Sequence, residues 1–170
     1  LLKSFEPAIV IEPLNSYRLK EKEPINYGDF CLKIGKVDFI RKGTDITIVS
    51  YGSTLRIVDK ACDILKEHDI SVDLIDIQSI IPFDIDNDII QSLKLTNKLL
   101  IVDEDLPGGA SSYILHKILD LNNGYNFLDS KPITLTGKDH RPPYGTDGDY
   151  YSKPSIAVSY THLTLPTSVP

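Results

Sequence analysis

The chain has 170 residues, of which 41% are hydrophobic and 25% are charged, and its 18 basic and 24 acidic residues give a net charge of −6. The length suits one domain with a further segment, and the composition is that of a globular protein. The acidic balance argues against a nucleic-acid partner, and the apolar runs are far shorter than the ~20 residues of a membrane helix. No signal sequence opens the chain, and Cys31 and Cys62 lack metal-binding spacing. We therefore expect a cytoplasmic protein with reduced thiols and no membrane partner.

The two ends of the chain differ from the rest. The chain contains no methionine and begins with leucine, so we expect that its N-terminus was cut from a larger protein. Residues 158–167, VSYTHLTLPT, resemble a translated sequencing-library adapter, and the charge-rich sequence stops after Lys153. A native edge strand is the alternative, because apolar or aromatic residues alternate with polar ones there. We expect residues 158–170 to be a non-native tail without function.

The first predicted elements surround a linker. Residues 7–12 form a short apolar run that predicts a buried strand. The polar stretch 15–29 contains Pro24 and Gly28, which indicates a connection between domains. A further strand is predicted over residues 33–41.

From Thr44 onwards, strands alternate with helices. Apolar runs of strand length occupy residues 45–50, 72–77, 99–102 and 132–136. Because each run is continuous in Ile, Leu and Val, the sequence predicts a three-layer α/β domain. Its mostly parallel sheet carries helices on both faces.

Three helices are predicted between these strands. Ser53 is placed to cap the first, Asp84 or Asp86 can cap a short second helix that runs through Leu93, and the third starts at Ala110. Two sets of residues recur at helical spacing and predict buried faces: Leu55, Val58, Cys62 and Leu65 in the first helix, and Ala110, Ile114, Ile118 and Leu121 in the third. Gly124 is expected to end the third helix as a left-handed residue.

The chain offers few residues for chemistry. Gly108 and Gly109 lie between a strand and a helix, where backbone N–H groups can hold a phosphate, but a tight turn is the better interpretation. Asp103, Glu104 and Asp105 follow the same strand and favour a solvated acidic turn over a metal site, because neighbouring side chains point apart.

The loop around His140 is the other candidate. Two prolines stiffen the segment from Asp139 to Gly145, whose Arg, His and Tyr side chains suit a protein interface or an anion. A rigid structural loop is favoured over a direct role in chemistry. These residues predict no catalytic centre.

Five segments, in this order, resemble the beta subunits of thiamine-diphosphate-dependent 2-oxo acid dehydrogenases. They are residues 7–18 (PAIVIEPLNSYR), 43–55 (GTDITIVSYGSTL), 75–84 (IDIQSIIPFD), 102–109 (VDEDLPGG), and 139–144 with 149–151 (DHRPPY and DYY). The resemblance implies a transketolase C-terminal-like domain over residues 31–157. Residues 1–30 are then the end of a pyrimidine-binding domain and a linker.

The resemblance also implies a function and partners. The parent enzyme would oxidatively decarboxylate pyruvate or a branched-chain 2-oxo acid and pass the acyl group to lipoyl-lysine, with thiamine diphosphate and Mg²⁺ as cofactors. Its partners would be the alpha part of the enzyme, a second beta part and the dihydrolipoyl acyltransferase core. The family's catalytic, cofactor and metal residues lie outside this stretch, so we expect the fragment alone to be inactive and to bind no cofactor. Its role would be assembly, with Gly108, Gly109, His140, Arg141 and Tyr144 as interface candidates.

Two alternatives remain open. A fragment of a transketolase or deoxyxylulose-phosphate synthase would act on sugar phosphates, but Glu12, Pro13 and Leu14 stand where sugar-phosphate transketolases carry Ser-Arg-Gln. The loss of that cation argues for a non-phosphorylated 2-oxo acid. The other alternative is a freestanding α/β module that binds a nucleotide at Gly108 and Gly109.

Overall fold

A computed structural model describes residues 5, 7–20, 23, 25, 28, 30–140, 148, 152–157 and 159. In this part of the chain, no helix has the length and apolar character needed to cross a membrane. Of the predicted tail, only Ser159 lies within the described residues, where its backbone N–H donates to the Ser155 carbonyl at 2.9 Å.

The domain is built on a five-stranded sheet with the order β1-β3-β2-β4-β5. The strands are β1 (Asp38–Arg41), β2 (Ile46–Ser50), β3 (Val72–Asp76), β4 (Leu99–Val102) and β5 (Ile133–Leu135). Strand β2 pairs in parallel with β3 and β4, and β4 pairs in parallel with β5. Only β1 is antiparallel, against β3, with a bulge between Phe39 and Arg41.

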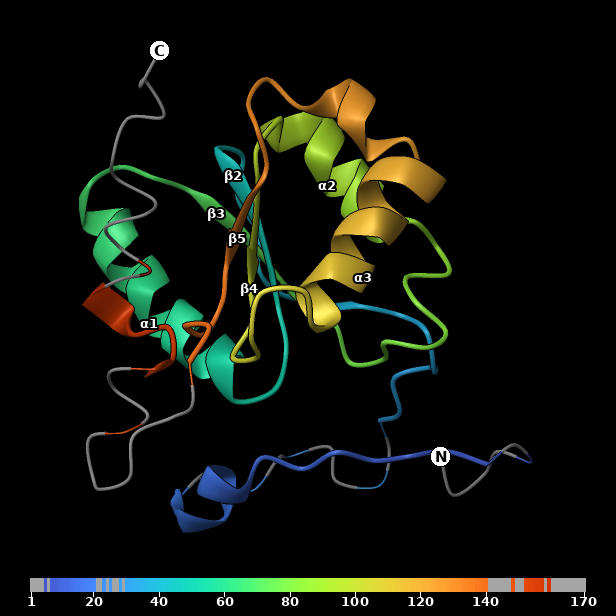
Figure 1. Cartoon of the computed structure of the whole chain (residues 1–170), viewed down its shortest axis with the longest axis vertical. Coiled ribbons are helices and arrows are strands. Elements are labelled where there is room, and N and C mark those ends of the chain that lie inside the picture. The colour runs from blue at the N-terminus through green and yellow to red at the C-terminus, as the bar shows by residue number, and fades with distance from the viewer. Residues whose placement is uncertain are drawn as a thin grey trace.

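Helices cover both faces of this sheet. They are α1 (Gly52–Glu67), α2 (Asp88–Thr96) and α3 (Ala110–His116). Helix α3 continues into a π-helical turn, η2 (Lys117–Leu121), and two short 3-10 helices are η1 (Leu14–Arg18) and η3 (Gly124–Phe127). Figure 1 shows α1 on one side of the sheet and α2 with α3 on the other.

Two apolar clusters hold these layers together. One joins Ile48 and Leu74 of the sheet to Leu65 of α1, and the other joins Ile75 to Leu93 of α2. All five side chains are fully buried, and burial of each contributes about 1.5–3 kcal/mol. The predicted three-layer α/β fold with a mostly parallel sheet is therefore confirmed.

Most predicted elements occur close to their expected bounds. The face of α1 is as predicted, since Val58, Cys62 and Leu65 are buried and Leu55 packs against them. Asn87 occupies the N-cap position of α2, but the carboxylate of Asp84, one of the two predicted caps, accepts hydrogen bonds from the backbone N–H groups of Asp88 and Ile89 at 2.9 and 3.0 Å. Asp84 therefore satisfies the first turn of the helix from three residues before the N-cap.

The prediction of a buried strand over residues 7–12 is wrong. No strand forms there, and Ile9 and Ile11 are 91% and 86% exposed. In Figure 1 this blue segment lies apart from the sheet and is not paired with it. The next predicted strand, over residues 33–41, begins only at Asp38, because Gly35 at φ 85° makes a turn before it.

Three finer predictions about the helices are also wrong. Ser53 does not cap α1, because the helix begins at Gly52 and Ser53 already lies inside it. Leu121 is 54% exposed, because the wider π-helical turn rotates it off the face that Ile118 occupies. Asn123, and not Gly124, takes the left-handed conformation, with φ 56°.

Gly124 is required for a different reason. A Cβ atom at this position would lie 2.5 Å from the carbonyl oxygen of Ile118, a contact that would force the backbone apart. The residue therefore permits close packing of the chain after α3.

Candidate functional site

The predicted interface residues Gly108 and Gly109 belong to a turn at the carboxyl end of the sheet, which we call the Asp103 turn (residues 102–111). This turn connects β4 to α3 and lies at the lower edge of the sheet in Figure 1. The loop from β2 to α1 reaches the same edge, because β2 and β4 are parallel neighbours. Carboxyl ends of parallel strands are the usual place for ligands in α/β domains.

Asp103 is the centre of the turn. Its side chain is fully buried, although the sequence favours a solvated carboxylate at this position. Oδ1 accepts hydrogen bonds from the Tyr51 hydroxyl at 2.6 Å and from the Asp105 backbone N–H at 3.0 Å. Oδ2 accepts one from the Ser111 backbone N–H, at the start of α3, at 2.9 Å. These three donors replace the water that burial removes, so Asp103 joins the β2–α1 loop to α3.

The electrostatics of the pair keep Tyr51 protonated. Burial of the phenol raises its pKa well above the ordinary value, and the hydrogen bond to Asp103 raises this pKa further. Tyr51 therefore acts as a hydrogen-bond donor at neutral pH. Local sequence patterns do not predict this contact, because 52 residues separate Tyr51 from Asp103.

Glu104 joins two more segments to the turn. Oε2 of Glu104 accepts a hydrogen bond from the Ser53 hydroxyl at 2.6 Å and lies 3.6 Å from Nζ of Lys153. The two carboxylates that follow Asp103, those of Glu104 and Asp105, are exposed, as the sequence predicts. The side chain of Ser53 thus fastens α1 to the turn.

Gly108 and Gly109 shape the turn. Gly108 has a φ of 95°, which favours glycine, and a Cβ atom at Gly109 would overlap the Asp105 carboxylate. An anion placed at Gly109 would meet that negative charge. The geometry supports the tight-turn interpretation and argues against a phosphate site.

The chain leading to the His140 loop is fastened to the same turn. The backbone N–H of Gly137 donates to the Asp105 carbonyl at 2.8 Å, and that of Lys138 donates to the Ser152 carbonyl at 2.8 Å. His140 is exposed, and its backbone N–H donates to the Lys138 carbonyl at 2.8 Å. Arg141 and Tyr144 lie outside the described residues. The structure thus brings the glycine turn and the start of the His140 loop to one edge.

Nothing in this arrangement forms a metal site. Within the described ranges, no three His, Cys, Asp or Glu side chains are grouped so that they could hold a metal ion. The Asp103 carboxylate is already occupied by its three donors. What the turn can do is present a shaped, rigid surface.

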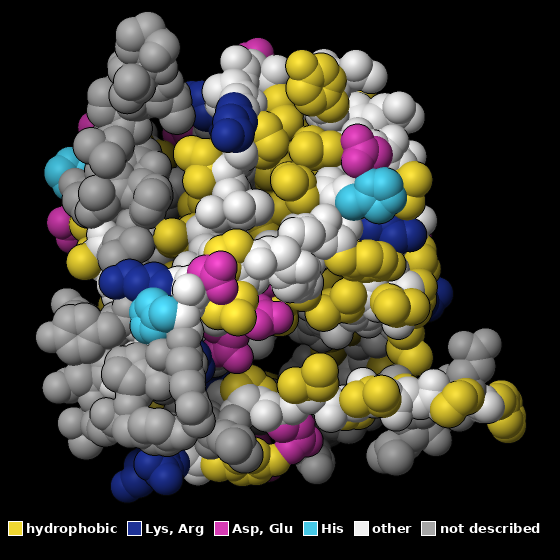
Figure 2. Space-filling view, in the orientation of Figure 1, with side chains coloured by type: hydrophobic (Ala, Val, Ile, Leu, Met, Phe, Trp, Pro, Cys, Tyr) yellow, Lys and Arg dark blue, Asp and Glu magenta, His cyan; other side chains and the backbone are white. Residues whose placement is uncertain are grey.

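A second surface is the apolar segment before the domain, which we call the N-terminal strip (residues 9–11, 17 and 19). Its side chains Ile9, Val10, Ile11, Tyr17 and Leu19 are between 52% and 91% exposed. Figure 2 shows hydrophobic side chains following this segment along the lower edge of the molecule. The Tyr17 hydroxyl donates a hydrogen bond to the carboxylate of Glu12, so the polar ends of these two side chains are paired with each other.

Comparison with known proteins agrees with this fold. The model of the transketolase C-terminal domain matches residues 35–152. The beta subunit of the pyruvate dehydrogenase E1 component from Mesostigma viride is 34% identical over 143 residues, which are 84% of this chain and 42% of that protein. The beta subunit of acetoin:2,6-dichlorophenolindophenol oxidoreductase from Bacillus subtilis (strain 168) is 30% identical over 159 residues, 92% of this chain and 45% of that protein.

A solved structure shows the same architecture. It is described as a split-gene transketolase, an inactive beta4 tetramer, and it superposes with a TM-score of 0.62 at 19% identity over 78% of this chain and 41% of that chain. At this identity the likeness shows the fold alone. The chain spans less than half the length of the curated relatives it matches. From the family match and the fold, the chain belongs to the transketolase C-terminal domain family.

Proposed function

We propose that the chain is the C-terminal assembly domain of the beta subunit of a 2-oxo acid dehydrogenase. The parent enzyme would oxidatively decarboxylate pyruvate or a branched-chain 2-oxo acid and transfer the acyl group to lipoyl-lysine. The similarity to pyruvate dehydrogenase E1 beta subunits supports this proposal, as does the 30% identity to an oxidoreductase beta subunit. Alone, the chain would have no activity.

The exposed N-terminal strip is the observation that carries the assembly role. Large apolar side chains such as Ile9 and Ile11 are mostly exposed to water, which is unfavourable. Neighbouring side chains of this kind mark a surface that another part of a protein covers. The alpha part of the enzyme, a second beta part and the acyltransferase core are the partners we propose. The Asp103 turn, with Gly108 and Gly109, and the exposed His140 would offer them a contact surface.

Thiamine diphosphate and Mg²⁺ would belong to other parts of the parent enzyme. Mg²⁺ prefers oxygen ligands, carboxylates among them, and the described residues contain no suitable group of three metal-binding side chains. When bound to the parent enzyme, thiamine diphosphate would supply the electron sink for decarboxylation. This chain would support the subunits that hold it.

We further propose a cytoplasmic location. Cys31 and Cys62 are both free thiols, which suits a reducing compartment. Detection of the parent protein in a secreted fraction would contradict this part of the proposal.

The function is tested on the intact gene. The reading frame should be extended from the source DNA past both ends, and the complete enzyme assayed with pyruvate, branched-chain 2-oxo acids and a ketose phosphate. We expect decarboxylation of a 2-oxo acid that depends on thiamine diphosphate and Mg²⁺. Turnover of the ketose phosphate alone would support a transketolase or deoxyxylulose-phosphate synthase and refute the proposal.

A further inference from the structure

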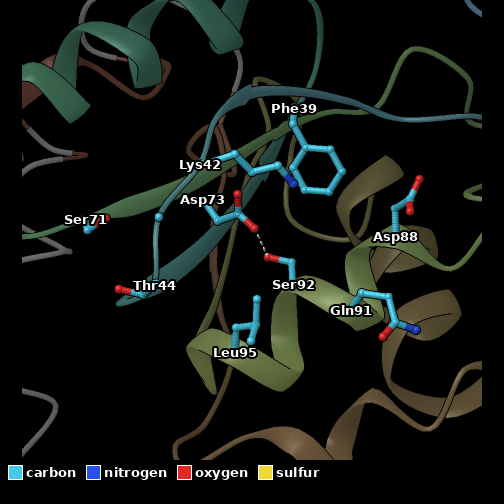
Figure 3. A pocket seen from close by; sticks show the side chains of 10 residues that line it. Phe39, Lys42, Thr44, Ser71, Asp73, Asp88, Gln91, Ser92 and Leu95 are labelled. Carbon is cyan, nitrogen blue, oxygen red and sulfur yellow. Dashed lines mark hydrogen bonds between the residues drawn. The ribbon is translucent and has the colours of Figure 1, made fainter.

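A cavity of about 470 Å³ lies at the opposite end of the sheet from the Asp103 turn. Its walls are the chain before β2, the start of β3, the end of β1 and one side of α2. Figure 3 shows Asp73, Lys42 and Phe39 arranged around it, with Ser92 and Leu95 on α2 below them. A volume of this size is in the range of small-molecule sites.

A buried carboxylate with an unsatisfied oxygen lines the cavity. Asp73 is only 2% exposed, and its Oδ2 accepts a hydrogen bond from the Ser92 hydroxyl at 2.5 Å. Ser92 Oγ also lies 2.6 Å from Thr47 Oγ1, which lies 2.7 Å from Thr96 Oγ1. Of these three hydroxyls, only that of Ser92 donates a hydrogen bond to the Asp73 carboxylate. Oδ1 of Asp73 is buried and has no hydrogen-bond partner.

A buried carboxylate oxygen is destabilising unless a donor reaches it, and a cation is the strongest donor. In Figure 3 this oxygen points away from Ser92, towards the side on which Lys42 and Phe39 lie. The charged side chains that line the cavity are Asp73, Asp88 and Lys42, which sum to one net negative charge. The lining therefore favours a ligand with one positive charge.

The other walls indicate what kind of cation fits. The Phe39 ring already faces a cation, since Nζ of Lys42 lies 2.7 Å from its centroid, and Leu95 adds a 68% exposed apolar side chain. A divalent metal ion is disfavoured, because the described residues contain no group of three metal-binding side chains and the cavity is far larger than an ion. An organic cation uses both the charge and the apolar walls.

We infer that this cavity is a binding site for a small organic ammonium ion. The ammonium group donates a hydrogen bond to Oδ1 of Asp73, and its short apolar chain lies against Phe39 and Leu95. The site does not depend on the proposed function, because it lies at the other end of the sheet from the Asp103 turn.

Lys42 competes with this ligand. Its side chain is exposed, and its ammonium group must leave the face of the Phe39 ring before the apolar chain of the ligand can lie there. Its ammonium also repels an incoming cation. Replacing Lys42 with a neutral residue should therefore tighten binding, by roughly fivefold for two charges about 4 Å apart in water.

The test uses the 170-residue chain labelled with ¹⁵N and titrated with n-butylammonium chloride, with sodium chloride added to hold the ionic strength constant. We expect saturable shifts at the amides of Ser71, Asp73 and Ser92. Asp73→Asn should weaken binding by roughly tenfold or more, since it removes a charge-assisted hydrogen bond. Asp76→Asn is the matched control, because it lies on the same strand outside the cavity lining and should leave binding unchanged.

Three results would overturn the inference. The first is no saturable shift with n-butylammonium, and the second is equal shifts with potassium chloride, which would indicate an inorganic cation site. The third is unchanged or weaker binding in Lys42→Gln, an exposed substitution that decides the matter even if Asp73→Asn does not fold.

Discussion

The hydrogen bond from Tyr51 to Asp103 is open to a direct measurement of its stabilising effect. Tyr51→Phe removes only the hydroxyl and leaves the Asp103 carboxylate with its two backbone donors. Hydrogen bonds to charged groups contribute about 1.5–3 kcal/mol. Tyr51 is partly exposed, so water can replace some of the lost interaction, and we expect a loss of about 1.5 kcal/mol.

Urea unfolding followed by far-ultraviolet circular dichroism measures this loss. With an m value of about 1.5 kcal/mol/M, the midpoint should fall by about 1 M while the slope stays unchanged. Tyr125→Phe is the matched control, because Tyr125 is 73% exposed, and its free energy of unfolding should stay within about 0.5 kcal/mol of the wild-type value.

The pH dependence adds a second readout. Burial first, and Asp103 second, raise the pKa of Tyr51 in the folded protein above its ordinary value of 10.0. The protonated phenol therefore stabilises the fold fully below about pH 10, and this contribution is lost as the pH rises towards the folded-state pKa. The difference in the free energy of unfolding between wild type and Tyr51→Phe should stay constant from about pH 7 to 9 and become smaller above about pH 10. A difference that grows with pH, or that is no larger than the difference between wild type and Tyr125→Phe, would refute this account.

Three further predictions concern other parts of the domain. Burial raises the pKa of the Cys62 thiol to about 12, so a disulfide reagent at neutral pH should modify the exposed Cys31 quickly and Cys62 only on unfolding; two fast thiols would contradict this. Gly124→Ala should destabilise the fold by about 1–3 kcal/mol in urea unfolding, because its Cβ would meet a backbone carbonyl 2.5 Å away, and a change below about 0.5 kcal/mol would be evidence against that contact. Arg41 holds β1 to α1 through two carboxylates at 2.6 and 2.7 Å, so Arg41→Ala should cost about 1 kcal/mol, less at high salt, whereas an effect independent of salt would indicate packing instead.

Local sequence patterns predicted the structure correctly where all the residues of the pattern lie in one helix or strand. The three- and four-residue spacing of Val58, Cys62 and Leu65 predicted the buried face of α1, because a helix places these positions on one side. The apolar run at residues 7–12, in contrast, predicted a strand that does not form. An apolar run shows that a segment needs cover, but it does not show that a neighbouring strand within this domain provides it.

Such local patterns do not predict contacts between segments that are far apart in the sequence. The sequence placed Asp103 in a solvated turn, since nothing near it in the chain supplies the Tyr51 hydroxyl. The π-helical turn that exposes Leu121 has no sequence signal in a single chain. The boundaries predicted at residues 31 and 157 and the interface roles of His140, Arg141 and Tyr144 stay predictions.

The two ends of the sheet differ in how their buried carboxylates are satisfied, and this difference separates their functions. At the carboxyl end, the Asp103 carboxylate accepts hydrogen bonds from three donors within the domain, and these hydrogen bonds stabilise the turn. At the amino end, Asp73 has one donor and a free oxygen beside a cavity. A satisfied carboxylate gives a rigid surface suited to subunit contact, whereas an unsatisfied one favours an added cation. Ligand binding at Asp73 should therefore leave the Asp103 turn, and any assembly it supports, unchanged.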